Sequence, residues 1–141
     1  MKKPDLVCLT EIVVRFSEVD SMGVVWHGNY IKYLEDGREA FGARYGLGYL
    51  DFHRNGVMVP LVKISCDYKK PLKYGDSAIV ETKFINCESA KLQFDYIIYN
   101  KSNRDIISTA TSVQVFIDRN MELLLDIPAF VREWKKKNGL I

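Results

Sequence analysis

The stretch that determines the fold, residues 29–48, reads NYIKYLEDGREAFGARYGLG. Its apolar residues recur at helical spacing, which is typical of a helix that buries one face. Asn29 is a candidate cap at the start, and Gly46 and Gly48 are stop signals at the end. The same stretch contains small residues that let a sheet backbone approach closely, namely Gly37, Ala40, Gly42 and Ala43. We therefore predict a long helix wrapped by a sheet.

Outside this helix, apolar and polar residues alternate as they do in half-buried strands. A first strand is predicted from Glu11 to Phe16, followed by a loop over residues 17–28. Further strands are predicted over residues 62–69, 78–84, 92–98 and 107–117, with short turns that make neighbours antiparallel. Pro128 and the apolar face of Phe130, Val131 and Trp134 predict a short C-terminal helix. The predicted fold class is α+β, with a curved antiparallel sheet of about five strands on one long helix, in a single domain over residues 1–141.

The composition is that of a globular domain, since 48% of the 141 residues are hydrophobic and 27% are charged. The net charge of +2 is spread along the chain, which argues against a nucleic-acid partner. Three widely spaced cysteines favour reduced thiols over disulfides, and no metal-ligand spacing is present. No apolar run is long enough to span a membrane or to act as a secretion signal. We expect a cytoplasmic protein that uses neither metal nor cofactor.

The candidate chemistry lies in residues 20–30, which read DSMGVVWHGNY. Asp20 places a carboxylate in a loop, Gly23 permits a sharp turn, and the chain then enters a helix near His27. Free N–H groups at a helix N-terminus can stabilise negative charge on a carbonyl oxygen. A thioester suits such a site, because its thiolate leaving group has a pKa of about 8.5 and needs no strong general acid. This stretch therefore favours thioester hydrolysis.

Over nearly its whole length the sequence resembles the hot-dog fold acyl-CoA thioesterases of the 4-hydroxybenzoyl-CoA and Tol-Pal-associated type. The first motif of that family is Asp-x-x-Gly-x-Val followed by Asn-Tyr. It is matched by Asp20, Gly23, Val25, Asn29 and Tyr30. A second motif, Tyr-x-x-Pro followed by Gly-Asp, is matched over residues 68–76.

The resemblance implies that Asp20 is the nucleophile or general base and that the backbone N–H of His27 polarises the thioester carbonyl. It also implies a homodimer or homotetramer whose sites lie between subunits and bind acyl-CoA or an acyl carrier protein thioester. The substrate-binding candidates are Gly23, Val25, Asn29, Tyr30, Lys69, Lys70 and Lys91. Some relatives have basic residues in the turn that here reads Glu88-Ser89-Ala90, so the three lysines are the remaining candidates for phosphate contact.

Several of these candidate residues also have a simpler, purely structural interpretation. Asn29 and Tyr30 could be only a cap and a core anchor, and surface lysines are usually only solvated. Glu35 and Glu39, four residues apart on the long helix, more often mark a solvated face than an acid-base pair. Two other functions also remain open. A hydratase or dehydratase of the same fold would need a histidine paired with an acid, and a non-catalytic module would only bind acyl thioesters.

Overall fold

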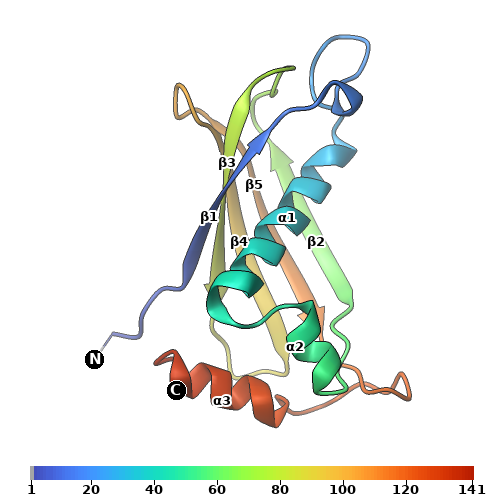
Figure 1. The fold of residues 1–141 in the computed structure, drawn as a ribbon, viewed down its shortest axis with the longest axis vertical. Coiled ribbons are helices and arrows are strands. Elements are labelled where there is room, and N and C mark those ends of the chain that lie inside the picture. Colours follow the sequence, from blue (N-terminus) through green and yellow to red (C-terminus); the bar gives the residue numbers. More distant parts are fainter. Residues whose placement is uncertain (1) are drawn as a thin grey trace.

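The structure is a computed structural model that describes residues 2–141. Its elements in chain order are β1 (Val7–Val13), a 3₁₀ turn (Phe16–Glu18), α1 (Gly28–Tyr45), α2 (Tyr49–Arg54), β2 (Leu61–Tyr68), β3 (Ser77–Ile85), β4 (Lys91–Asn100), β5 (Ile106–Val115) and α3 (Ala129–Lys137). The strands form one antiparallel sheet in the order β1-β3-β4-β5-β2. The sheet curves around α1, and α2 and α3 lie together at one end of it (Figure 1). This arrangement confirms the predicted α+β architecture.

The core is built between α1 and the sheet, because one face of α1 is apolar and contains a small residue at the point of closest approach. Leu34 and Phe41 are almost fully buried on this face. A side-chain carbon added at Gly37 would lie 2.4 Å from Thr82 Oγ1 and 2.8 Å from Val80 Cγ1, both on β3. Only glycine therefore allows α1 to lie this close to β3, as the small residues predicted.

The first strand lies earlier in the sequence than predicted. β1 covers Val7–Val13 rather than residues 11–16, and its inward side chains include the buried Cys8. Phe16 belongs to the 3₁₀ turn and its side chain is 77% exposed. The alternation that continues to Phe16 therefore extends beyond the sheet, and the strand boundary predicted from it was wrong.

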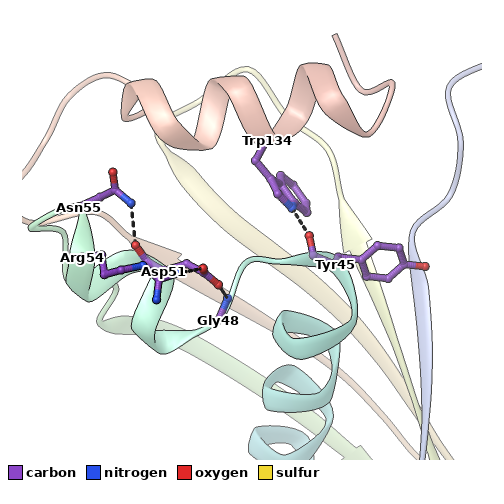
Figure 2. Close-up of polar contacts among 6 residues, drawn as sticks. All are labelled: Tyr45, Gly48, Asp51, Arg54, Asn55 and Trp134. Atoms are coloured by element: carbon purple, nitrogen blue, oxygen red, sulfur yellow. Dashed lines mark hydrogen bonds and ion pairs between the residues drawn. The ribbon is translucent and has the colours of Figure 1, made fainter.

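The stretch after α1 also differs from the prediction. Gly46 ends α1 as expected, but Gly48 is the residue that caps the start of α2, an element that the sequence analysis did not predict. The N–H of Gly48 donates to Asp51 Oδ2 at 2.7 Å, and the Asn55 side chain donates to the Asp51 carbonyl at 2.8 Å (Figure 2). Gly42 faces this turn rather than the sheet, since an added carbon there would lie 2.8 Å from Gly48 Cα.

The closing helix α3 begins after Pro128, close to where it was predicted. Its Trp134 indole N–H donates to the Tyr45 carbonyl at 2.6 Å, which joins α3 to the end of α1 (Figure 2). The Tyr45 hydroxyl in turn donates to the Val7 carbonyl at 2.8 Å. β1 and α3 are therefore both attached to the C-terminal end of α1. Within residues 2–141, no helix combines the length and apolarity needed to cross a membrane.

β2 is an edge strand, which pairs only with β5. The alternation over residues 62–69 predicts one apolar side, formed by Val62, Ile64, Cys66 and Tyr68. In the structure Ile64 and Cys66 are half-buried, but Val62 is 58% exposed and Tyr68 is also exposed. The prediction of one buried face along the whole of this strand was therefore wrong at its two ends.

Candidate active site

Asp20 lies in a tight hairpin between the 3₁₀ turn and α1. Its N–H donates to the Val24 carbonyl at 2.8 Å, and its carbonyl accepts from the Gly23 N–H at 3.0 Å. Gly23 has a φ of 78°, a left-handed conformation that glycine adopts without strain. The Asp20 side chain is half-buried and its Oδ1 accepts from the Met22 N–H at 2.8 Å. Within the described chain Oδ2 accepts no hydrogen bond. One carboxylate oxygen therefore holds the turn and the other is free to meet a substrate.

The hairpin is attached to the turn between β2 and β3, which contains the second sequence motif. The N–H of Val25 donates to the Leu72 carbonyl at 2.8 Å, and Val25 is buried. The N–H of Leu72 donates to the hydroxyl of Tyr30 at 3.2 Å. Burial raises the pKa of Tyr30 above its usual value. Tyr30 therefore acts here as a buried anchor between α1 and this turn, and Val25 as part of the same attachment.

Glu18 connects the hairpin to α1 through both its backbone and its side chain. Its carbonyl accepts from the Trp26 N–H at 2.9 Å and from the Asn29 side-chain amide at 2.8 Å. Its Oε1 accepts from the Tyr33 hydroxyl at 2.9 Å. Burial and the adjacent Glu18 carboxylate raise the pKa of Tyr33 well above its usual value. These bonds hold the Asp20 hairpin at a fixed position relative to the first turns of α1.

Asn29 was expected as a helix cap and as a substrate contact. The structure places it inside the first turn of α1, where the helix begins at Gly28 and His27 is the capping residue, so the expectation of a cap was wrong. The Asn29 amide is buried and donates to Glu18. Glu18 itself was missed, because its partners are 11 and 15 residues away and no local pattern connects them.

The second part of the candidate site is the start of α1, where His27 is the capping residue. In the described part of the chain, no acceptor is found for the backbone N–H of His27 or of Gly28. The exposed His27 ring packs on Trp26, with ring centroids 4.7 Å apart, and its carbonyl accepts from the Tyr68 hydroxyl at 3.2 Å. Trp26 also covers Gly28, where an added carbon would lie 2.0 Å from the indole. Trp26 and Tyr68, which the sequence analysis did not assign to the site, therefore shape this helix N-terminus.

The three candidate lysines do not come together within one chain. Lys69 and Lys70 follow β2 close to the site end of the sheet, and Lys70 Nζ lies 3.1 Å from Asp105 Oδ2. The Lys69 N–H donates to the carbonyl of Ile107, at the start of β5. Lys91 instead pairs with Val115, at the end of β5. These two positions on β5 are about 27 Å apart at the rise of an antiparallel strand. Lys91 is therefore remote from Asp20 in its own chain.

Comparison with known proteins supplies the family. A profile of the thioesterase-like superfamily matches residues 14–135. The chain belongs to this superfamily. Within it, the putative acyl-CoA thioesterase YneP of Bacillus subtilis is 39% identical over 109 residues, which are 77% of this chain and 78% of YneP. The chloroplastic acyl-acyl carrier protein thioesterase ATL3 of Arabidopsis thaliana is 28% identical over 122 residues, 86% of this chain and 64% of ATL3.

The chain shares its fold with solved structures of thioesterases. A DHNA-CoA thioesterase from Staphylococcus aureus superposes with a TM-score of 0.83 at 25% identity, over 92% of this chain and 87% of that one. A 4-hydroxybenzoyl-CoA thioesterase variant has the same fold, with a TM-score of 0.79 at 18% identity, over 92% of this chain and 98% of that one. The hot-dog fold and the family resemblance are therefore confirmed, and the chain is a member of a family of thioester hydrolases.

Proposed function

We propose that this chain hydrolyses acyl-CoA thioesters to a free acid and CoA. The observation that carries the proposal is the arrangement of Asp20 and the start of α1. The free carboxylate oxygen belongs to a hairpin whose second half leads directly into the N-terminus of α1, where the N–H groups of His27 and Gly28 have no acceptor among the described residues. A fixed carboxylate and preorganised donors for an oxyanion are the groups that acyl transfer requires.

In the proposed reaction, Asp20 either attacks the carbonyl carbon or takes a proton from an attacking water. The carbonyl oxygen becomes negative and accepts a hydrogen bond from the His27 or Gly28 N–H at the positive end of α1. The C–S bond then breaks and the thiolate leaves without help from a strong acid. If Asp20 attacks directly, water hydrolyses the resulting anhydride and restores the carboxylate.

A hydratase mechanism has less support from the site. It needs a histidine positioned by an acid, whereas among the described residues no carboxylate forms an ion pair with the His27 ring, which packs on Trp26. The proposal therefore uses the His27 backbone rather than its imidazole.

We also propose that the active unit is a dimer formed along β2. The outer edge of β2 pairs with no other strand within residues 2–141, and the exposed side chains of this strand include Leu61, Val62 and Tyr68. An exposed strand edge is a template for pairing with another chain. Tyr68 contacts both His27 and Tyr30, so a partner along β2 would lie next to the start of α1. This placement supports a site completed by the second subunit, where Lys69, Lys70 or the partner's lysines could meet the CoA phosphates.

The test is a thiol-release screen of the purified chain over short, long and aromatic acyl-CoAs, with acyl carrier protein thioesters in parallel. We expect steady turnover with at least one class. Addition of water to crotonyl-CoA without thiol release would replace the proposal with a hydratase. Tight acyl-CoA binding with no thiol release from any substrate would replace it with a non-catalytic module.

A further inference from the structure

A large apolar cavity lies on the side of α1 away from β1 and β3. α1 packs most closely against those two strands, and the residues that line the cavity come from α1, α2, β4, the end of β5 and the segment before β2. The cavity has a volume of about 790 Å³, and its apolar walls include Leu47, Phe52, Val57, Leu92 and Phe94. This volume is within the range of small-molecule sites, which is roughly 300–1,000 Å³. Neither Asp20 nor His27 lines the cavity.

The cavity lies further along α1 than the proposed site, at a separation that can be compared with the length of an acyl chain. Arg38 lines it and lies eleven residues after His27 on α1, or roughly 16 Å along the helix axis. An extended chain of on the order of ten bonds spans most of this distance, since three backbone bonds of a peptide span about 3.5 Å.

Arg38 is a charged residue in the mostly apolar lining of this cavity. Its side chain is half-buried, and Nη1 donates to the Tyr96 hydroxyl at 3.0 Å. Tyr96 is buried and shares a 2.6 Å hydrogen bond with Ser112, which holds the guanidinium in place. No carboxylate among residues 2–141 forms an ion pair with Arg38. A guanidinium has five N–H donors, and one of them is used here.

The surrounding charges select the kind of group that Arg38 could bind. Glu35 and Glu39 also line the cavity, so an anionic acyl group would approach two carboxylates as well as one cation. A neutral oxygen acceptor would gain a charge-assisted hydrogen bond from Arg38 without that repulsion.

We propose that Arg38 binds a hydroxyl or keto oxygen carried far along the acyl chain, so that the preferred substrates are oxygenated medium-chain or long-chain acyl thioesters. This inference rests on the proposed thioesterase function and adds a substrate class to it. A hydrogen bond from a charged donor is stronger than one between neutral groups, so a substrate without the oxygen should be hydrolysed less efficiently.

The test compares ω-hydroxydodecanoyl-CoA, a keto analogue and dodecanoyl-CoA by their kcat/KM values. We expect the wild-type chain to favour the oxygenated substrates by at least about tenfold. In Arg38→Met the ratio should fall close to one, while in Arg44→Met, which changes an exposed arginine of α1 outside the cavity, it should stay at the wild-type value.

The possible outcomes distinguish a failure of the Arg38 role from a failure of the proposed thioesterase function. Hydrolysis of all substrates by the wild-type chain with a ratio near one would overturn the role of Arg38 and leave the thioesterase proposal standing. Preference for dodecanedioyl-CoA, which carries a distal carboxylate, would overturn the choice of a neutral group. No hydrolysis of any thioester would contradict the thioesterase proposal itself. The wild-type ratio decides the question even if Arg38→Met fails to fold.

Discussion

Replacing Asn29 with alanine removes the side-chain bond between α1 and the Asp20 hairpin. The Asn29 amide is buried and donates to the Glu18 carbonyl at 2.8 Å, while that carbonyl keeps its bond from the Trp26 N–H at 2.9 Å. Loss of one such bond and of the buried amide should cost about 1–2 kcal/mol, or roughly 3–7 °C in Tm. The hairpin would then be less well fixed relative to the helix N-terminus, so we expect kcat to fall on the order of 10–100-fold.

Asn86→Ala is the matched control for this prediction. The Asn86 amide donates to the Leu140 carbonyl at 3.0 Å, which is the same kind of bond between the end of β3 and the C-terminal segment. We expect Asn86→Ala to lower Tm by at most a similar amount and to leave kcat within about twofold, because nothing near Asp20 changes. Thermal unfolding and thiol release measure the two effects separately. Normal kcat in Asn29→Ala, or an equal loss in both variants, would refute the positioning role of the Glu18 contacts.

Three further outcomes follow from other parts of the structure. Gly23→Ala should cost about 1–2 kcal/mol and strongly reduce turnover, because alanine is strained at the left-handed φ that shapes the hairpin; unchanged Tm and turnover would contradict this. The pKa of Tyr33 is raised in the folded chain, so the contribution of the neutral Tyr33 hydroxyl to folding stability is present below pH 10.0 and is lost as the pH rises above 10.0. In alkaline unfolding, Tyr33→Phe should therefore lose less stability above pH 10.0 than the wild type does. Val62→Lys on β2 should give a monomer by sedimentation, while Leu9→Lys on the opposite edge strand β1 should not; the reverse result would place the interface on β1.

The main elements of the fold were predictable because they extend over many residues with a regular period. α1 spans 18 residues with a consistent inner face, and the β3 and β4 alternation matches their burial closely. α2 was missed because it has only six residues, too few for a period to show. The edge strand β2 was predicted with the wrong exposure at its ends, because alternation does not report which strands lie at the edge of a sheet.

The site was predictable only in its local part. The spacing of Asp20, Gly23 and the helix start is contained in one short stretch, and the structure gives each the conformation expected of a turn leading into a helix. The Glu18 contacts and the Arg38–Tyr96 bond join residues 11 to 58 positions apart. Such contacts depend on the completed packing of α1 against the sheet, so no sequence period indicates them.

The most direct test of the account is the turnover of Asp20→Asn with an acyl-CoA that the wild-type chain hydrolyses. The amide oxygen of asparagine can still accept from the Met22 N–H, so the hairpin and Tm should be retained. Asparagine cannot act as a nucleophile or base, and we expect thiol release to fall by at least about a hundredfold. Turnover close to wild type in the folded variant would contradict the assignment of Asp20 as the catalytic carboxylate.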